Sequence, residues 1–401
     1  MPVYYPIIKK NAKLQEKTVI ENGTVTPDQG FDGLSKVTVS VAGGGGMSGF
    51  HMVRFFNDDR TTLLYTVFVP DGASAIYAGE TPVSTEDGGA PFAGFEPAAV
   101  NVTEDMDCFA VYELAVGTLD ETSWATISKL SAKGEAQNYF AVGDTKMIHI
   151  EGTVGTLAVD GDYGVYIIGF DHNEELEGKG IHFGTFKTAV SSTQTLALCD
   201  SKGGSSTAGD GTKYFNINHW GKNNLGGWSA CDLRYDVLGS TDTPPSNYGA
   251  QRISGDVGYD ATETCATNPV ANTLMAALPA DLRAVMKPMT KYTDNVGGAT
   301  NDNTNVTQTV DYLPLLAEYE IFGARTHANE NEQNKQARYA YFRNGNSTKM
   351  YKHTATSTGT IWWGRSPASQ DGDRFCRILS DGRAAYYEST YSYGLAPIFK
   401  V

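Results

Sequence analysis

Histidines and cysteines are the side chains most often used in catalysis and metal binding, and their spacing here matches no such motif. No two of the seven histidines stand three or four residues apart, which would place them on one face of a helix. They are His51, His149, His172, His182, His219, His327 and His353. We therefore predict no metal and no cofactor, while a histidine cluster formed only in space stays open.

The five cysteines also lack the spacing of a zinc or redox motif. Cys108, Cys199, Cys231, Cys265 and Cys376 are an odd number at wide intervals, and no C-x-x-C occurs. We expect buried free thiols in a protein assembled in a reducing compartment.

Acidic residues give no clear catalytic pattern either. Residues 58–59, 160–162 and 371–373 form short acidic turns without EF-hand spacing, although a structural calcium or magnesium ion in a loop stays open. Glu318 and Glu320 could serve glycosidase chemistry, but we expect them to flank a helix end. Because nucleophile-elbow, P-loop and H-E-x-x-H motifs are also absent from the sequence, we do not expect an enzyme.

Two stretches near the C-terminus have the composition of a recognition surface. Residues 368–374 and 386–393 combine Tyr, Ser, Asp and Arg, and tyrosine supplies contact area at low entropy cost. Aromatic and arginine side chains dominate binding hot spots. The candidates for exposed contacts are therefore Arg383, Tyr386, Tyr387, Tyr391 and Tyr393.

Apolar segments around these stretches predict the frame that positions them. The apolar residues of 395–401 must leave water, so the C-terminus is expected to form a core strand. Trp362 and Trp363 are expected to pack in another core strand rather than to stack on a sugar. Arg365, two residues later, is expected to pair with a carboxylate inside the fold.

Composition limits the class of protein. A length of 401 residues predicts two or three domains, and 44 glycines with 22 tyrosines favour strands and ordered loops. A net charge of −15 argues against a nucleic-acid partner. We expect no signal peptide, since residues 1–10 lack an apolar core, and no membrane insertion, since no run of about 18 apolar residues occurs.

Three segments are predicted along the chain. Residues 1–46 contain two short strands around the Asn22-Gly23 turn, an alternating strand at 37–41 and a glycine hinge at 43–46. Residues 47–117 form a small module with paired strands at 51–57 and 63–69 and further strands within 92–112. Residues 118–401 form the large C-terminal domain.

The C-terminal domain is predicted to be mixed, which makes the fold class α+β and β-rich. A helix over 124–130, capped by Asp120 or Thr122, precedes strands at 147–150, 153–159 and 165–170. Helices follow at 272–277 and 279–286, with Pro279 in a first turn. The polar segment 294–309 is predicted to be an exposed insertion.

An ordered series of motifs over 118–401 resembles a domain of unknown function common in gut phages and bacteria. The resemblance implies a C-type-lectin-like (formylglycine-generating-enzyme-like) fold. Gly364 stands where that family usually has leucine. The matching residues are Trp124, 142–144, 228–234, 278–282, 315–323, Ile361-Trp362-Trp363-Gly364-Arg365-Ser366-Pro367, Asp381-Gly382-Arg383 and 394–401.

Two further resemblances lie upstream. Residues 21–41 resemble a segment of tail-associated proteins from phages of gut Firmicutes. Residues 92–112 are similar to the internalin B-type repeat, a β-grasp-like module that usually serves as a spacer. Neither the lectin calcium motifs nor the paired cysteines of formylglycine-generating enzymes occur in the sequence, so those activities do not carry over.

Together these resemblances imply a phage tail-associated receptor-binding protein of the virion, made in the host cytoplasm. The implied partners are a host cell-surface protein or glycan and, through the N-terminal region, other tail proteins, in a homo-oligomer such as a trimer. Such lectin-like domains serve as variable proteins of diversity-generating retroelements. The implied variable, ligand-binding positions are Ala368, Ser369, Gln370, Asp371, Asp373, Arg374, Tyr386, Tyr387, Ser389, Tyr391 and Tyr393.

Two alternatives stay open. A structural tail protein would account for the N-terminal segment without any receptor. A bacterial surface adhesin would account for the spacer, although the absence of a signal peptide counts against it.

Overall fold

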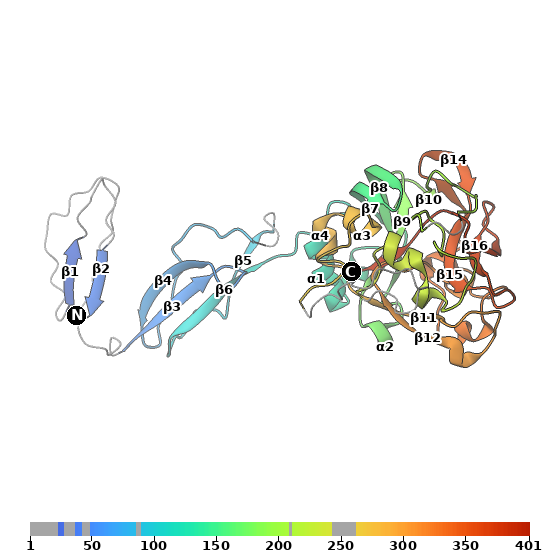
Figure 1. Ribbon diagram of the computed structural model, residues 1–401. Coiled ribbons are helices and arrows are strands. Elements are labelled where there is room, and N and C mark those ends of the chain that lie inside the picture. Colours follow the sequence, from blue (N-terminus) through green and yellow to red (C-terminus); the bar gives the residue numbers. More distant parts are fainter. Residues whose placement is uncertain (1–22, 28–36, 42–48, 86–89, 208–210, 243–261) are drawn as a thin grey trace. The chain divides into compact units, whose positions relative to one another are not determined.

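The chain divides into two compact units in a computed structural model, Met1–Glu113 and Leu114–Val401 (Figure 1). The structure describes residues 23–27, 37–41, 49–85, 90–207, 211–242 and 262–401. Within these, β-strands outnumber helices and form several separate sheets. The prediction of a β-rich α+β fold is therefore confirmed.

The N-terminal unit begins with a two-stranded sheet. Strand β1 (Gly23–Pro27) pairs antiparallel with β2 (Val37–Val41). The alternating strand at 37–41 is thus confirmed, and it pairs with Gly23–Pro27. The strand predicted just before the Asn22-Gly23 turn and the glycine hinge at 43–46 lie outside the described ranges.

A four-stranded sheet completes the N-terminal unit, in the order β4-β3-β6-β5. Its strands are β3 (Phe50–Phe56), β4 (Leu63–Pro70), β5 (Phe92–Glu96) and β6 (Met106–Tyr112). The predicted pairing of β3 with β4 is confirmed, and it is antiparallel. Strand β3 also pairs parallel with β6. Val53, Phe55 and Cys108 form the centre of a small core beneath the sheet.

The C-terminal unit is built on a seven-stranded sheet in the order β14-β13-β10-β9-β8-β7, with β18 paired to β9. The strands are β7 (Thr145–Val154), β8 (Leu157–Phe170), β9 (Ile181–Lys187), β10 (Thr195–Ala197), β13 (Met350–Lys352), β14 (Ala355–Thr360) and β18 (Ile398–Lys400). All residues of β9 and β18 are buried, so the C-terminus is the core strand that its apolar residues predict.

Helix α1 (Trp124–Lys133) lies against this closing strand. Its N-cap is Ser123, whose hydroxyl accepts from the backbone of Thr126, instead of the predicted Asp120 or Thr122. Trp124, buried at its first turn, packs edge-on against Phe183 and Phe399. A hydrogen bond also joins α1 to the C-terminal residue, because the Ser131 hydroxyl donates to the carbonyl of Val401.

The remaining helices are short. They are α2 (Glu174–Glu177), α3 (Leu274–Ala277), α4 (Ala280–Arg283), α5 (Glu318–Phe322) and α6 (Ala340–Arg343). The two helices predicted around Pro279 exist, but the second ends at Arg283 instead of residue 286. No helix among the described residues is both long and apolar enough to cross a membrane.

The segment predicted to be an exposed insertion connects two paired strands, and its residues 298–304 are exposed as predicted. Strands β11 (Met289–Asp294) and β12 (Val306–Asp311) pair antiparallel and include both ends of the 294–309 segment. Asp294 and Thr309 are buried. The prediction was wrong at these ends because their polar side chains bond inside the fold: Thr309 donates to Asp311, and Asp294 accepts from Asn329.

Candidate functional site

The predicted recognition residues lie on and around a three-stranded antiparallel sheet. Its strands, in order, are β15 (Trp362–Pro367), β16 (Arg374–Ile378) and β17 (Ala384–Glu388). β15 is buried throughout, with Trp362 and Trp363 in two different core clusters, so the packing role predicted for both is confirmed. Every residue of β17, an edge strand, is partly exposed.

Strand geometry separates the predicted tyrosines into two groups. Successive side chains of a strand point to opposite faces, so Tyr386 and Tyr387 cannot share a surface. Tyr386 lies beside His327, with ring centroids 4.7 Å apart. Tyr387 instead contacts Tyr391 and lies against the main core.

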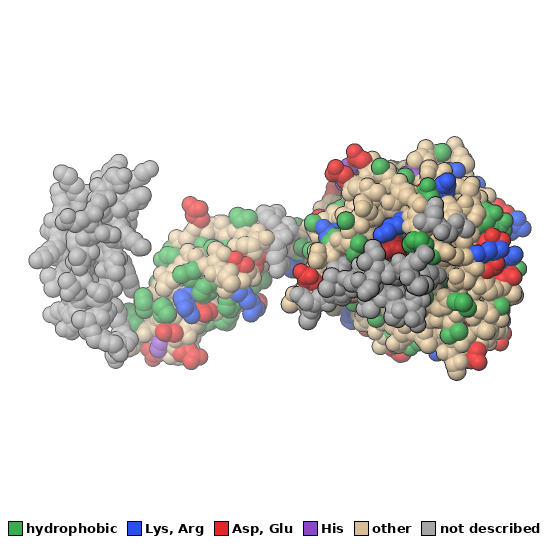
Figure 2. All heavy atoms as spheres, in the orientation of Figure 1, with side chains coloured by type: hydrophobic (Ala, Val, Ile, Leu, Met, Phe, Trp, Pro, Cys, Tyr) green, Lys and Arg blue, Asp and Glu red, His purple; other side chains and the backbone are tan. Residues whose placement is uncertain are grey.

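The first group, the Arg374 cluster, consists of Arg374, Tyr386, His327, Asp371 and Asp373. The Arg374 guanidinium lies over the Tyr386 ring, 5.4 Å from its centroid. It is also 3.5 Å from a carboxylate oxygen of each aspartate. Basic and acidic side chains accordingly gather at the flank of the unit where Figure 1 places β16 (Figure 2).

Lys222 extends this cluster to the edge strand. Its ammonium lies 2.8 Å from Glu388 and 3.1 Å from Asp373. Hydrogen bonds to Glu388 and then to Asp373 raise the pKa of the lysine. The lysine therefore links the 371–373 turn to the end of β17.

The second group, the tyrosine cluster, consists of Arg377, Tyr387, Tyr391 and Tyr393. The Arg377 guanidinium lies 4.2 Å from the centroid of Tyr387 and 4.8 Å from that of Tyr393, whose hydroxyl accepts from it. Tyr391 meets Tyr387 edge-on at 4.7 Å. The pKa of Tyr393 is raised to about 12, mainly by burial of the phenol. The arrangement holds two partly exposed phenol rings, Tyr387 and Tyr391, in fixed orientations.

A pocket of about 220 Å³ borders the tyrosine cluster at Tyr393. Among the described residues, the Lys352 ammonium in its lining has no ion-pair partner. The other lining residues are Cys199, Asp200, Gly203, Gly204, Gly359, Thr360, Ile361, Ser380 and Gly394. Sequence analysis missed this pocket because its residues come from segments far apart in the chain, with no motif in any one of them.

Three predicted contact residues are buried, and the expectation that they are exposed was wrong. The backbone NH of Ala368 donates to the carbonyl of Arg374, and the residue is only 1% exposed. Ser389 donates its backbone NH to Asp373, and its hydroxyl accepts from Asn223. Tyr393 packs against Trp363 at 4.9 Å.

The remaining predicted residues reach the surface to different extents. Gln370 is exposed, and partial exposure is shared by Ser369, Asp371, Asp373, Arg374, Tyr386, Tyr387 and Tyr391. Arg383 has a side chain 77% exposed and pairs with Asp381. It lies at the turn of the β16–β17 hairpin, whereas Arg374 pairs with Glu388 at the open end. Arg383 is therefore outside both clusters.

Residues 221–227, which the sequence did not single out, bind the backbone of the Arg374 cluster. The side-chain amide of Asn224, which is fully buried, donates to the carbonyls of Asp371 and Arg374 at 2.7 and 3.1 Å. Its backbone NH donates to Gly372. The Gly and Asn content of residues 221–227 was the available signal, because such residues often form ordered turns.

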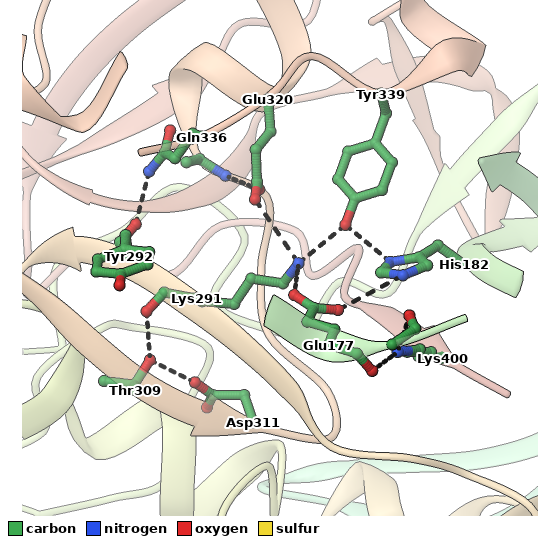
Figure 3. Close-up of polar contacts among 12 residues, drawn as sticks. Glu177, His182, Lys291, Tyr292, Thr309, Asp311, Glu320, Gln336, Tyr339 and Lys400 are labelled. Atoms are coloured by element: carbon green, nitrogen blue, oxygen red, sulfur yellow. Dashed lines mark hydrogen bonds and ion pairs between the residues drawn. The ribbon is translucent and has the colours of Figure 1, made fainter. Parts of the chain in front are cut away.

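A buried ionic network is joined to β15 by Arg365, and Figure 3 shows its part around Lys291 and Glu320. Arg365 from β15 forms two hydrogen bonds with Glu320 of α5, at 2.5 and 3.0 Å, which confirms its predicted inner carboxylate partner. Burial would raise the pKa of Glu320, but Arg365 and then Lys291 outweigh it and lower that pKa to about 2. Glu318 accepts from the backbone of His327 and Ala328. Both glutamates lie in the first turn of α5, in agreement with the prediction that they stand at a helix end.

Lys291 extends the network to the central sheet. Its ammonium lies 3.3 Å from Glu177 and donates to the hydroxyl of Tyr339 at 3.0 Å. The same hydroxyl lies 3.0 Å from Nδ1 of His182 and forms a hydrogen bond with it. These side chains are buried, and the described pockets do not include them, so the network is suited to fixing the fold rather than to meeting a substrate.

The five cysteines are buried free thiols, as predicted. Burial raises the pKa of the Cys376 thiol, which lies in β16. A thiol that stays protonated is a poor nucleophile.

Acid is expected to destabilise the C-terminal unit through His172, whose ring stacks on Tyr339 at 3.7 Å. Burial lowers the pKa of His172 from 6.5 to about 3. The neutral ring of His172 contributes to the unfolding free energy above pH 6.5. This contribution is lost as pH falls toward about 3, by about 1.4 kcal/mol per pH unit. His172→Phe keeps the stacked ring, so its unfolding free energy should fall less steeply in urea titrations between about pH 7 and about pH 4. Parallel slopes for both proteins would contradict this assignment.

Residues 212–401 match a family described as a domain of unknown function (DUF6273). The matched region contains β15, β16 and β17 with both clusters. No curated protein and no solved structure matches the chain. The C-terminal part of the chain is thus similar to a family that has no assigned activity.

Proposed function

We propose that this chain is a phage tail-associated receptor-binding protein that attaches to a host cell-surface ligand through the edge of its C-terminal unit. The observation that carries the proposal is the tyrosine cluster beside the 220 Å³ pocket. Two partly exposed tyrosines, an arginine and a concavity are the features that binding hot spots share. The Arg374 cluster, on the other face of β17, is a second contact area.

The frame under these clusters supports a binding role. A receptor-binding surface needs side chains that keep their orientation before the ligand arrives, because ordering them on binding costs affinity. Arg377 lies against Tyr387 and Tyr393, and the adjacent β15 is anchored by the buried Arg365–Glu320 pair. The lectin-like assignment of this unit is part of the proposal.

The N-terminal unit would attach the chain to other tail proteins, with the four-stranded sheet as a spacer. A homo-oligomer such as a trimer would present several copies of the binding edge, and multivalency would raise the overall affinity. The proposed location is the virion, after synthesis in the host cytoplasm.

Diversification by a retroelement is proposed only for the positions with solvent exposure. A substitution at Gln370, Asp371, Asp373 or Tyr386 changes the surface and leaves the core intact. Ala368, Ser389 and Tyr393 are excluded because they are buried. A reverse-transcriptase gene beside a near-copy of the C-terminal coding sequence would support this part of the proposal, whereas tail genes alone would leave only the attachment role.

The binding test compares two tyrosine variants of the full chain on a panel of gut Firmicutes strains. Replacing both Tyr387 and Tyr391 by alanine should weaken binding to the host strain by about 2 kcal/mol or more, roughly thirtyfold. Tyr139→Ala is the matched control, because Tyr139 is 54% exposed and belongs to neither cluster. Its binding should equal that of the unmodified chain.

Folding of the variants must be checked alongside. Tyr387 and Tyr391 pack against the main core, so their loss should cost about 1–2 kcal/mol of stability rather than the 0.5 kcal/mol typical of the surface. Normal binding by the folded double variant would remove the tyrosine cluster from the contact surface. Absence of binding to every strain by the unmodified chain would favour a structural tail protein.

A further inference from the structure

A histidine and two aspartates lie close together near residues 221–227, the segment that supports the Arg374 cluster. His219, Asp232 and Asp236 each offer one ligand atom, and these atoms all lie within 4.8 Å of one another. Asp236 belongs to the short helical turn Leu233–Val237, and Asp232 directly precedes it. The three are spaced unlike any metal motif, which is why the sequence predicted no site here.

The hydrogen bonds of His219 define which ring nitrogen is available. Its Nε2 lies 3.1 Å from the carbonyl oxygen of Tyr214, which can only accept, so Nε2 carries a proton. In the neutral ring, Nδ1 then presents a lone pair. The His219 side chain is fully buried, and Nδ1 finds no hydrogen-bond partner in the described part of the chain.

The distance from Nδ1 to its nearest carboxylate oxygen distinguishes a shared proton from a shared metal ion. Nδ1 lies 3.6 Å from Oδ2 of Asp236, whereas a charged N–H···O bond spans about 2.7–2.9 Å. Two ligands bound to one tetrahedral Zn²⁺ at about 2.0–2.1 Å are about 3.3–3.4 Å apart. The observed separation is closer to that of two ligands of one metal ion.

We propose that His219, Asp232 and Asp236 bind one divalent metal ion of the zinc class. One imidazole and two carboxylates suit Zn²⁺ or Mn²⁺, whereas Ca²⁺ and Mg²⁺ prefer oxygen ligands alone. Two carboxylates also neutralise the charge of the dication.

Neighbouring groups orient the ligands in the manner of known metal sites. The Nε2–H donation to a backbone carbonyl is the usual support for a histidine bound through Nδ1. Asp232 is held toward His219 because its Oδ2 accepts from the His219 backbone NH at 2.7 Å. Lys213 is a competing cation, since its ammonium lies 3.5 Å from the other oxygen of Asp236, and its side chain is 45% exposed.

The metal would act on structure rather than on a substrate. His219 lies in the same segment as Lys222 and Asn224, which hold the end of β17 and the 371–373 turn. A metal ion at His219 would fix the start of this segment. The site does not depend on the proposed receptor, so its test is independent of host binding.

The test uses the full chain after dialysis against a chelator. Calorimetric titration should show one Zn²⁺ bound per chain with micromolar or tighter affinity, Mn²⁺ bound at the same site, and Ca²⁺ bound far more weakly. Co²⁺ should give the visible absorption of a four-coordinate site. Asp236→Asn keeps the side-chain shape and should weaken Zn²⁺ binding by at least about tenfold.

A second histidine–aspartate group provides the matched control. His149 lies 2.9 Å from Asp162 and 3.4 Å from Asp160, through opposite ring nitrogens and on the exposed surface. Asp162→Asn should leave the Zn²⁺ affinity unchanged. The proposal would be overturned if the unmodified chain bound no Zn²⁺ at micromolar concentrations, or if Asp236→Asn and Asp162→Asn lowered the affinity equally. The unmodified chain alone decides the first point, even if Asp236→Asn does not fold.

Discussion

Replacing Arg365 by methionine is expected to lower the unfolding free energy of the C-terminal unit by about 3–5 kcal/mol. Arg365 is fully buried and is the bidentate partner of Glu320. Its Nε also donates to Thr293 at 2.8 Å, and Nη1 donates to the carbonyl of Leu315 at 2.9 Å. Methionine fills part of the space but leaves the Glu320 carboxylate with Lys291, 3.8 Å away, as its one ionic partner among the described residues.

Urea unfolding followed by tryptophan fluorescence measures this effect in the right unit, because all five tryptophans lie within residues 114–401. The double variant with Glu320→Gln as well removes the unpaired charge and should recover part of the loss. If the single and double variants were equally unstable, the cost would come from packing and not from the ion pair.

Phe399→Ala is expected to cost about 3–5 kcal/mol by leaving a cavity at the closing strand. Phe399 is fully buried, and its ring stacks on Phe183 with centroids 5.0 Å apart and planes 8° apart. The control is Leu225→Ala, because Leu225 is 60% exposed and its truncation should change stability by about 0.5 kcal/mol or less. Equal losses in the two variants would contradict the assignment of β18 to the core.

The sequence predicted the frame well because the frame depends on burial. Trp362, Trp363 and the apolar C-terminus have no stable place in water, so their residue types alone predict the interior. Arg365 followed from the same argument, since a charge between buried residues needs a buried partner.

The candidate site was predicted less well, because it depends on geometry that composition does not contain. Residues 386–393 looked like one tyrosine surface, but the strand pleat turns Tyr386 and Tyr387 to opposite faces. Tyr393 became a core residue because Trp363 lies beside it. Neither Asn224 nor Lys352 was selected, because the residues that Asn224 bonds and those that line the pocket with Lys352 are distant in sequence.

The smaller errors in the sequence predictions arose from hydrogen-bond partners that the sequence alone does not reveal. Ser123 directly follows the second of the two predicted caps, Thr122, and starts α1 because its hydroxyl reaches the NH of Thr126. The 294–309 segment was assigned to the surface from its polarity, which holds for residues 298–304. Asp294 at its start is nevertheless buried, because it accepts from Asn329 inside the unit. Polar composition indicates exposure only where no buried partner exists.

Covalent labelling of tyrosines in the full chain, free and bound to intact host cells, tests the central claim most directly. The account predicts that Tyr387 and Tyr391 lose much of their reactivity on binding, while Tyr139 keeps its own, because only the first two belong to the contact surface. Protection confined to residues 49–113, with unchanged labelling of Tyr387 and Tyr391, would contradict it.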